Sequence, residues 1–480
     1  MLNLSQQQKL ISDLFTAWRG ERPSNIYSLP PSGSDRQYFR IQYNDSSLMG
    51  VYNPIEEENA AFLQFTKHFA KQGIPVPRIL NENTSQNVYF LEDLGNATLF
   101  SLLPHKREQV YFENSVMEIY KRTLDHLPVL QIKAAEGLNF SLCFPRSAFD
   151  RNSMMWDLNY FKYYFLKLAG IQYDEQKLED SFHSLCDFLL LADNNYFMYR
   201  DFQSRNIMLK DSLPWFIDYQ GGRKGPLQYD IASLLYDAKA NMHPAQREEL
   251  LNYYMEQVKK IIPLEENTFR KYFYGFVLIR ILQAMGAYGF RGFYENKTLF
   301  LQSIPYAQRN LLWLLENSKI PEGLDYLKQM ITKIIDSPNL KKYDQPSAGL
   351  KVSIHSFSYK KGFPNDDSGN GGGFVFDCRS LPNPGRQEQY KRLTGKDTSV
   401  IAYLEQEPAV GEFIENTSML VEKSVEAYLD RGFSDLMVCY GCTGGQHRSV
   451  YSAEKLAQRL LGKYDIKVDL QHKEANSWPL

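Results

Sequence analysis

The chain has 480 residues, of which 43% are apolar and 14% aromatic, and its charges nearly balance at a net −2. A chain of this length can form two to four domains with well-packed cores. The near-zero net charge excludes a general attraction to nucleic acid or to anionic membranes. Five cysteines in so long a chain do not make a disulfide framework, and their scarcity fits a reducing compartment.

The N-terminal residues 1–20 alternate apolar and polar side chains at helical spacing, without the continuous apolar core of a signal peptide. We therefore expect a surface helix here, in a cytoplasmic protein with no membrane partner. The most apolar window, 272–290, contains Arg280 and Gln283. It predicts a buried helix and not a membrane span.

A turn-rich segment at 30–36 precedes an alternating pattern at 38–43 that predicts a strand. Its small residues Ser32, Gly33 and Ser34 let backbone amides approach phosphates closely and are candidates for cofactor binding, although any hairpin uses such residues. A second strand is expected at 47–52. A helix then runs to Gly73, with its acidic residues in the first turn, where they favour the helix dipole.

An apolar strand at 88–91 ends in Glu92, Asp93 and Leu94 before a glycine. If the chain folds as a two-lobed kinase, this turn is the hinge whose backbone groups hydrogen-bond adenine, and otherwise it is a plain strand end. The patterns from 102 to 191 are mainly helical. Residues that select the substrate are expected in this helical part, with Asp157 and Asn159 as candidates.

The stretch 198–218 carries the pattern around which the chain is organised. A short apolar strand ends at Asp201, Asn206 follows on the return of a loop, and a second apolar strand leads to Asp218. We expect these three side chains at one end of a hairpin. In protein kinases the same spacing supplies one Asp for the acceptor hydroxyl and an Asn and an Asp for magnesium. The alternative is an ordinary hairpin with polar turn residues.

Asp230 begins the next helical pattern, and we expect it to brace the catalytic loop by accepting hydrogen bonds from backbone or from Arg205. Helical patterns continue to about residue 335. Residues 336–350 are polar, contain two prolines and have no periodicity, so they predict a linker between domains at 1–335 and 351–480.

Several motifs of the first domain belong together. They are Arg36 with Tyr38-Phe39-Arg40, Leu91-Glu92-Asp93-Leu94-Gly95, Arg200-Asp201-Phe202 with Arg205-Asn206, Ile217-Asp218-Tyr219-Gln220, and Tyr229-Asp230-Ile231-Ala232-Ser233. With these motifs the domain resembles the aminoglycoside phosphotransferase-like kinases, closest to the branch that phosphorylates the anomeric hydroxyl of N-acetylmuramate and N-acetylglucosamine. The resemblance implies a bilobal protein-kinase-like fold, ATP and Mg²⁺ as cofactors, and a role in recycling cell-wall sugars. It makes Asp201 the catalytic base and Asn206 and Asp218 the magnesium ligands.

Two positions depart from the pattern of that family. Tyr199 stands where a His usually precedes the catalytic Arg-Asp pair, and we expect it to anchor the loop by hydrogen bonding. The strand at 48–52 has no Lys, so the usual clamp on the α- and β-phosphates is missing. Arg36 or Arg40 is expected to supply that charge. The alternative is a degenerate lobe without kinase activity.

The second domain alternates strand patterns at 352–359, 374–378, 436–440 and 466–471 with helical patterns at 413–429 and 449–461. This alternation predicts a small α/β domain with a largely parallel sheet. Between the last strand-helix pair lies a Gly-rich turn, an arrangement that points backbone amides and a helix N-terminus at an anion. Arg448 adds a donor suited to phosphate.

Two other interpretations of this turn remain open. Cys442 followed by five residues and then Arg448 fits the spacing of cysteine-dependent phosphatases. Cys439, Cys442 and His447 could hold zinc, although only three ligands are visible.

The second domain also carries a set of shared motifs. They are Ser356-Phe357 with Lys361-Gly362, Phe376-Asp377-Cys378-Arg379 with Leu381-Pro382-Asn383-Pro384, Leu393-Thr394-Gly395-Lys396-Asp397, and Gly441-Cys442-Thr443-Gly444-Gly445 with His447-Arg448-Ser449. With these the domain resembles the C-terminal domain of the RapZ family of RNase adaptor and nucleotide-binding proteins. That resemblance implies sensing of glucosamine 6-phosphate and contact with RNA. The phosphosugar-binding candidates are Asp377, Arg379, Cys442, Thr443, Gly444, Gly445, His447, Arg448 and Ser449.

The charge of the second domain favours the sugar phosphate over RNA, because residues 336–480 carry 18 Lys and Arg against 19 Asp and Glu and offer no evident basic face. Together the two resemblances predict an amino-sugar kinase fused to a phosphosugar-binding regulatory domain. The alternatives are a non-enzymatic RNA-binding adaptor and a kinase of another small alcohol, such as an aminoglycoside. The sequence does not predict the oligomeric state.

Overall fold

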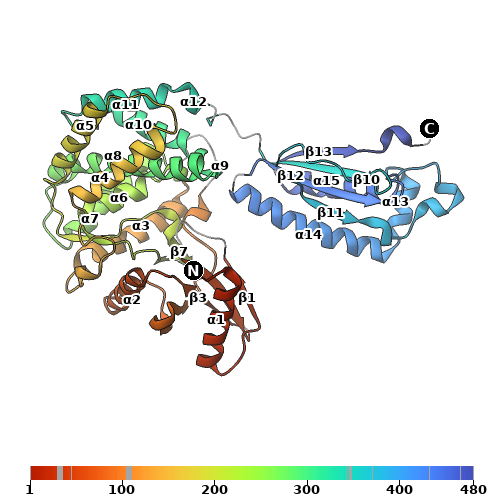
Figure 1. Ribbon diagram of the computed structural model, residues 1–480, viewed down its shortest axis with the longest axis horizontal. Coiled ribbons are helices and arrows are strands. Elements are labelled where there is room, and N and C mark those ends of the chain that lie inside the picture. Colours follow the sequence, from red (N-terminus) through yellow and green to blue (C-terminus); the bar gives the residue numbers. More distant parts are fainter. Residues whose placement is uncertain are drawn as a thin grey trace. The chain divides into compact units, whose positions relative to one another are not determined.

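The chain forms two compact units, residues 1–344 and residues 345–480. Each unit has its own hydrophobic core. Figure 1 shows the computed structural model, which describes residues 2–29, 36–44, 46–103, 111–341, 343–344, 349–369, 371–431, 433–464 and 466–478.

The first unit begins with a five-stranded antiparallel sheet in the order β1-β2-β3-β5-β4, here called the small lobe. Alternate strand residues face opposite sides, as the period-two pattern predicts. Phe39 and Ile41 pack against Ile11 and Phe15 of α1, while Val51 lies in the main core with α2. The bounds are α1 Leu4–Arg19, β1 Asn25–Ser28, β2 Gln37–Tyr43, β3 Ser46–Tyr52, α2 Glu56–Lys71, β4 Ile79–Asn83 and β5 Val88–Glu92.

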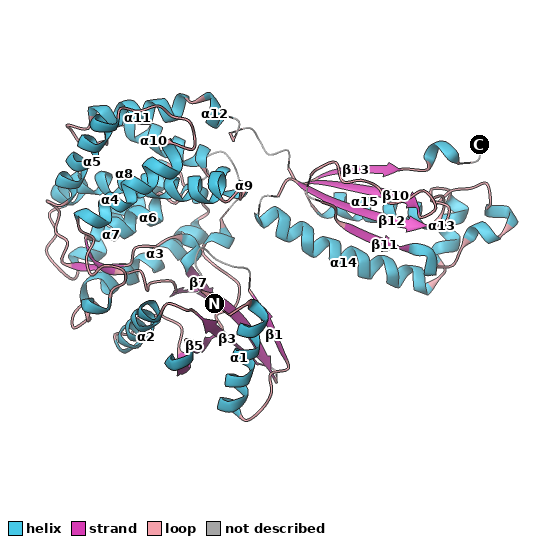
Figure 2. Ribbon diagram, viewed as in Figure 1, coloured by secondary structure: helices cyan, strands magenta, loops and turns pink. Residues whose placement is uncertain are grey.

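The rest of the first unit is mainly helical and is here called the large lobe (Figure 2). Helix α8 runs through its centre against α4, α5, α6 and α10. The helical segment Glu266–Tyr294 is long and apolar enough to cross a membrane, yet 67% of its most apolar window is buried inside the unit. It is therefore a core helix. The bounds are α3 Asn114–Pro128, α4 Arg151–Tyr160, α5 Glu175–Leu189, α6 Leu227–Leu235, α7 Pro244–Lys259, α8 Glu266–Gly289, α9 Thr298–Leu301, α10 Ile304–Glu316 and α11 Asp325–Asp336.

Two short antiparallel ribbons lie between α5 and α6 in the sequence. Strand β6 (Tyr196–Met198) pairs with β9 (Arg223–Gly225), and β7 (Ile207–Lys210) pairs with β8 (Leu213–Phe216). The expected single hairpin is therefore wrong in its pairing. Strands β7 and β8 form a hairpin with each other, and β6 pairs with β9, which lies farther along the chain than β8.

The end of the first unit extends beyond the expected boundary at residue 335. A short helix, α12 (Pro338–Lys341), falls within the segment expected to be a linker. Its Leu340 is 1% exposed and belongs to the core of the first unit. One apolar residue in a polar stretch gives too weak a pattern for this helix to be recognised from the sequence.

The second unit contains a four-stranded sheet in the order β11-β12-β10-β13, and every pairing is parallel. The predicted small α/β domain with a largely parallel sheet is confirmed. Side chains of α13, α14 and α15 share one core with residues of β10 and β12. The bounds are β10 Lys351–Ser358, β11 Phe374–Asp377, α13 Thr398–Glu405, α14 Pro408–Arg431, β12 Asp435–Cys442, α15 Arg448–Lys463 and β13 Lys467–His472.

Candidate active site

The structure brings Asp201, Asn206 and Asp218 together in the large lobe. Asp201 follows β6, while Asn206 precedes β7 and Asp218 follows β8 at the open end of the β7–β8 ribbon. The amide nitrogen of Asn206 donates to the backbone carbonyl of Asp201 at 2.9 Å and to Oδ2 of Asp218 at 3.2 Å. The three polar side chains expected from the sequence therefore share one site.

The electrostatics of this site favour a bound cation. Burial raises the pKa of the Asp218 carboxyl, and the nearby Asp201 carboxylate raises it further, against a 2.7 Å hydrogen bond from Gln220. Asp218 also has a φ of +70°, a backbone conformation that is uncommon for non-glycine residues. A divalent cation would relieve the repulsion between the two carboxylates.

The donor set fits magnesium. Carboxylate and amide oxygens are the hard ligands that Mg²⁺ prefers, and Asp218 with Asn206 would hold it. Within the described parts of the chain, no group of three His, Cys, Asp or Glu side chains could hold a metal ion. A magnesium ion here would accordingly complete its shell with phosphate oxygens and water, as in kinase sites.

A buried carboxylate braces the catalytic loop. Asp230 on α6 is 0% exposed and accepts hydrogen bonds from the backbone N–H groups of Tyr199 at 2.8 Å and Arg200 at 3.0 Å. Gln131 donates a third bond at 2.9 Å. Burial raises the pKa of Asp230 to about 7, although these three bonds lower it. The expected bracing by backbone groups is thus present.

Arg205 does not serve as the second bracing group that the sequence suggested. Its guanidinium lies 4.0 Å above the ring of Phe100, and the bonds to Asp230 come from backbone and Gln131. Tyr199, which replaces the usual histidine, donates from its hydroxyl to the backbone carbonyl of Ile217. This bond ties the catalytic loop to the residue before Asp218.

Asp157 and Asn159, expected to select the substrate, have other surroundings. Asp157 accepts from both terminal nitrogens of Arg200, at 2.8 and 2.6 Å. Arg200 also donates to the Tyr229 hydroxyl at 2.8 Å. Asp157 therefore positions the residue before Asp201. The Asn159 Oδ1 is buried and has no hydrogen-bond partner among the described residues.

Arg36 occupies the part of the small lobe where positive charge was expected. Its side chain is almost fully buried, and Nη2 lies 3.3 Å from Oε2 of Glu58 in the first turn of α2. None of its nitrogens meets the criteria for a hydrogen bond within the described residues. Its positive charge opposes the rise in the pKa of the Asp218 carboxyl. Arg36 is thus a buried cation near the candidate metal ligand.

Arg40, the other candidate for this charge, is committed to the hinge turn. Its Nη2 donates to Asp93 at 2.9 Å and to the backbone carbonyl of Gly95 at 3.0 Å, and its Nε forms an ion pair with Asp93 at 2.7 Å. Its Nη1 donates to Asn96 at 2.8 Å. These bonds stabilise the turn and leave Arg36 as the better placed cation.

The hinge side chains are also engaged with protein. Glu92 pairs with Arg78 at 2.9 Å and with Lys210, and these cations lower the pKa of Glu92 although burial raises it. The N–H of Leu94 has no hydrogen-bond partner in the described ranges. The hinge therefore offers a backbone donor, as expected. The candidates Ser32, Gly33 and Ser34 lie outside the described residues.

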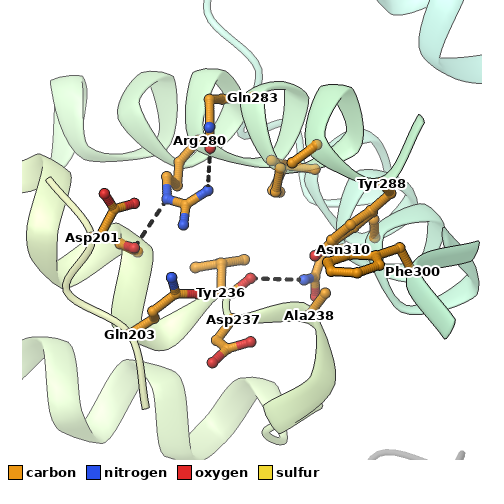
Figure 3. A pocket seen from close by; sticks show the side chains of 15 residues that line it. Asp201, Gln203, Tyr236, Asp237, Ala238, Arg280, Gln283, Tyr288, Phe300 and Asn310 are labelled. Atoms are coloured by element: carbon orange, nitrogen blue, oxygen red, sulfur yellow. Dashed lines mark hydrogen bonds between the residues drawn. The ribbon is translucent and has the colours of Figure 1, made fainter. Parts of the chain in front are cut away.

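A cavity of about 210 Å³ opens beside Asp201 (Figure 3). Its walls come from α6, α8 and α10 and the segment after α6. Sequence reasoning did not assign these residues to the acceptor, because they meet only through the packing of helices far apart in the chain. The lining includes Gln203, Ser233, Tyr236, Asp237, Arg280, Gln283, Ala284, Ala287, Tyr288, Phe300 and Asn310.

In the second unit, the candidate phosphosugar residues gather at one end of the sheet. The register pairs Asp377 at the end of β11 with Gly441 near the end of β12. Nη1 of Arg448 donates to the backbone carbonyls of Arg379 at 2.8 Å and Leu381 at 2.9 Å. Arg448 is therefore buried and connects the start of α15 to the segment that contains Arg379 and Leu381. It is not exposed, whereas the sequence pattern of the Gly-rich turn suggested an exposed phosphate donor.

The exposed part of this loop is small. Thr443 and Gly444 are exposed, whereas Gly445, His447 and Ser449 are buried. The side chains of Asp377 and Arg379 pair with each other at 2.7 Å near this loop. Thr443 and Gly444, together with Arg379, are thus the expected residues best placed to meet a ligand.

Cys442 and Cys439 do not form the zinc site considered above. Cys442 belongs to the core under the helices and Cys439 to the cluster on the other face of the sheet. Sγ of Cys442 lies 3.1 Å from the Ser449 hydroxyl and accepts from the Gly445 N–H at 3.2 Å. Burial raises the pKa of Cys442, but these donors lower it overall. At 3% exposure the thiol is poorly placed to attack a phosphate ester.

Comparison with known proteins defines the class of both units. Residues 27–260 match the model of the phosphotransferase enzyme family, and residues 350–476 match the model of the RapZ C-terminal domain. The resemblances to the aminoglycoside phosphotransferase-like kinases and to the RapZ C-terminal domain are confirmed, and the comparisons do not distinguish the amino-sugar branch of the first. The chain therefore combines a phosphotransferase-like domain with a RapZ C-terminal-like domain. The first match supports a kinase that acts on a small alcohol.

Individual relatives cover parts of the chain. A nucleotide-binding protein of Neisseria meningitidis serogroup C is 40% identical over 131 residues, which are 27% of this chain and 44% of the relative. The chain thus spans less than half the length of the curated relatives that it matches. A choline kinase from Cryptosporidium parvum covers 66% of this chain and 99% of its own at 13% identity and a TM-score of 0.46. The ADP-bound aminoglycoside phosphotransferase APH(2'')-Ib covers 69% and 97% at 11% identity and a TM-score of 0.43.

The raised pKa of Asp230 makes the stability of the first unit depend on pH. The folded pKa of about 7 lies above the unfolded value of 3.8, so the stabilising contribution is complete below pH 4 and is lost as pH rises through 7. Asp230→Asn cannot ionise. We expect the free energy of unfolding of the parent chain, relative to the variant, to fall by about 1 kcal/mol per pH unit in this window.

Urea unfolding of both proteins at pH values from 4 to 8, followed by tryptophan fluorescence, measures this difference. Four of the five tryptophans, Trp18, Trp156, Trp215 and Trp313, report on the first unit. A difference that stays constant, or that grows as pH rises, would show that the loop favours the ionised carboxylate.

Proposed function

We propose that the first unit is an ATP- and Mg²⁺-dependent kinase that transfers the γ-phosphoryl group to a hydroxyl of an N-acetylated amino sugar. The proposed acceptor is N-acetylmuramate or N-acetylglucosamine, and the proposed hydroxyl is the anomeric one. The observation that carries this proposal is the meeting of Asp201, Asn206 and Asp218 beside a cavity of about 210 Å³. A cavity below the 300–1,000 Å³ of drug-sized sites suits a small acceptor.

Asp201 is the group that acts on the acceptor. Its side chain lines the cavity, where the carboxylate would orient the hydroxyl and accept its proton as the oxygen attacks the γ-phosphorus, the bond from that phosphorus to the bridging oxygen breaks and ADP leaves. Magnesium, when held by Asn206 and Asp218, neutralises charge on the phosphates. Because phosphoryl transfer depends mainly on positioning and charge, the braced loop supplies most of what the reaction needs.

The small lobe would hold the nucleotide. The free N–H of Leu94 is suited to an adenine ring, and Arg36 supplies the positive charge that the lysine-free β3 strand lacks. Glu58 holds Arg36 in place as the acid of α2 does for the usual lysine. An ATP-dependent enzyme of this kind would work in the cytoplasm, in the recycling of cell-wall sugars.

For the second unit, we propose binding of an amino-sugar phosphate at the loop 442–449, with regulation of the kinase as its consequence. The support is the exposed pair Thr443 and Gly444 beside Arg379, at the N-terminus of α15. RNA binding by this unit is the rival proposal. The balance of 18 basic and 19 acidic residues over 336–480 makes it the weaker one.

Transfer of label from γ-labelled ATP to a panel of acceptors tests the kinase proposal. The panel contains N-acetylmuramate, N-acetylglucosamine, glucosamine, choline and an aminoglycoside. We expect labelling of an N-acetylated sugar, and a loss of kcat of about 1,000-fold in Asp201→Asn, because the variant cannot accept the proton. Asp211→Asn, in the exposed turn of the β7–β8 ribbon, is the matched control and should keep full activity.

ATP binding by titration calorimetry separates the alternatives. If only choline or the aminoglycoside becomes labelled, that compound class is the acceptor and the amino-sugar proposal is wrong. Tight ATP binding without transfer to any acceptor would favour the non-enzymatic adaptor. Equal transfer rates for Asp201→Asn and the parent chain would show that Asp201 is not the group that accepts the proton.

The roles of the two small-lobe arginines can be told apart by steady-state kinetics. We expect Arg36→Met to lower kcat by about 100-fold at saturating ATP, because it removes charge that faces the phosphates. Arg40→Met should raise KM for ATP, since it loosens the hinge turn, while kcat stays within about threefold. Arg36→Lys keeps the charge and should restore part of kcat. The reverse pattern would make Arg40 the phosphate cation.

The binding site of the second unit can be tested with two glycine variants. A Cβ added at Gly444 or at Gly462 would meet no atom within 4 Å, so both variants should fold. We expect Gly444→Ala to weaken binding of glucosamine 6-phosphate at least tenfold, because the methyl group keeps the phosphate from the backbone. Gly462→Ala, at the far end of α15, should bind like the parent chain.

Titration calorimetry on the full chain gives these affinities, with inorganic phosphate and glucosamine as comparison ligands. Equal affinities of the two variants, or no heat with any ligand, would remove the site from this loop. A gel shift with RNA at physiological salt would then support the rival proposal.

A further inference from the structure

The acceptor cavity contains an arginine whose charge the catalytic steps do not use. Three charged side chains line the cavity: Asp201, Asp237 and Arg280. Asp201 faces the reacting hydroxyl, and Asp237 accepts a hydrogen bond from the Ser204 hydroxyl at 2.6 Å. Arg280 is therefore the charged side chain of the lining that can bind the part of the acceptor that does not react.

The position of Arg280 is well defined. Its Nε donates to the Ser233 hydroxyl at 3.0 Å, and its Nη1 donates to Oε1 of Gln283 at 2.5 Å. No hydrogen bond of Nη2 to a described residue is present. Figure 3 shows the guanidinium projecting from α8 into the cavity, on the side of Asp201. Two neighbours thus hold the side chain, and one edge of its donor fork is left for a ligand.

Asp201 and Asp237 share the cavity with Arg280, and its other lining groups are neutral. Gln203, Gln283 and Asn310 offer amides, while Ala284 and Ala287 of α8 provide an apolar wall. Asp201 faces the reacting hydroxyl and Asp237 accepts from Ser204, so Arg280 is the charged group of the lining for the rest of the acceptor, and a quaternary ammonium or a polyamine would meet its like charge there. A planar carboxylate instead matches the guanidinium fork in shape and in charge.

We infer that Arg280 selects an acceptor that carries a carboxylate, so that an N-acetylated sugar acid such as N-acetylmuramate is preferred over the neutral N-acetylglucosamine. The inference rests on the proposed kinase function. The amides of the cavity hydrogen-bond the remaining polar groups of the sugar, and the alanines pack against its apolar edges. Arg280 is a specificity-determining residue and takes no part in the proton transfer.

A second role for Arg280 has to be separated from this one. The side chain lies on the same side of the cavity as Asp201, so it could instead contact the γ-phosphoryl group in transit. Such a contact would serve every acceptor equally. Selection of a carboxylate affects only the acceptor that carries one, so a pair of acceptors differing in that group separates the two roles.

The test compares kcat/KM for N-acetylmuramate and N-acetylglucosamine in the parent chain, Arg280→Gln and Arg280→Lys. We expect the parent chain to prefer N-acetylmuramate, and Arg280→Gln to lose about 10- to 100-fold on that acceptor, mainly through KM, with a change below threefold on N-acetylglucosamine. Arg280→Lys should lose less of the kcat/KM for N-acetylmuramate, because lysine keeps the positive charge but lacks the two parallel N–H donors of the guanidinium. Arg270→Gln is the matched control, since Arg270 lies on the same helix and pairs with Glu248 at 2.8 Å, away from the cavity lining.

Circular dichroism and thermal unfolding check that each variant folds. A loss in Arg280→Gln that is equal for both acceptors would overturn the inference in favour of a phosphoryl contact. Unchanged kinetics, or a parent chain that prefers N-acetylglucosamine, would also overturn it while leaving the kinase proposal intact. If the parent chain phosphorylates neither sugar, the proposed function fails and this inference fails with it.

Discussion

The hydrogen bonds from the backbone of Tyr199 and Arg200 to the buried carboxylate of Asp230 are the interactions on which the candidate active site depends. They connect the end of β6 to α6 and thereby place Asp201 at the mouth of the cavity. Tyr199 continues the connection through its hydroxyl to Ile217, the neighbour of Asp218. A single carboxylate without solvent contact thus holds the segment after β6, and through Tyr199 it is connected to the segment after β8. Its raised pKa reflects the desolvation that this arrangement requires.

Four arginines near the candidate site have different partners. Arg200 is held by Asp157 and stabilises the loop, Arg40 is held by Asp93 and stabilises the turn after β5, and Arg36 lies beside Glu58. Arg280 stands apart, in the acceptor cavity. Although β3 contains no lysine, the buried Arg36 beside Glu58 of α2 supplies positive charge near Asp218.

In the second unit, the sequence pattern predicts the location of the Gly-rich turn but does not predict the contacts that its side chains make. The strand, Gly-rich turn and helix lie where expected, and the parallel register brings β11 and β12 to the same edge. Yet Nη1 of the buried Arg448 donates to two backbone carbonyls, and the Cys442 thiol lies against the Ser449 hydroxyl and the Gly445 N–H. Buried polar groups must find partners, so residues that look reactive in a motif often serve the loop itself. The exposed residues of the loop that a ligand could contact are Thr443 and Gly444, with Arg379 nearby.

Local patterns in the sequence were enough to predict the two-unit architecture, most of the strands and the closeness of Asp201, Asn206 and Asp218, because these depend on periodicity and on short spacings along the chain. Tertiary packing alone decided the pairing of β6 with β9, the inclusion of α12 in the first core, and the commitment of Arg40 and Asp157 to structural partners. It also decided the acceptor cavity, where α6 and α8 bring Ser233 and Arg280 within hydrogen-bonding distance although 47 residues separate them. Spacing along a chain carries no information about such contacts, since they form only when helices far apart in sequence pack around one core.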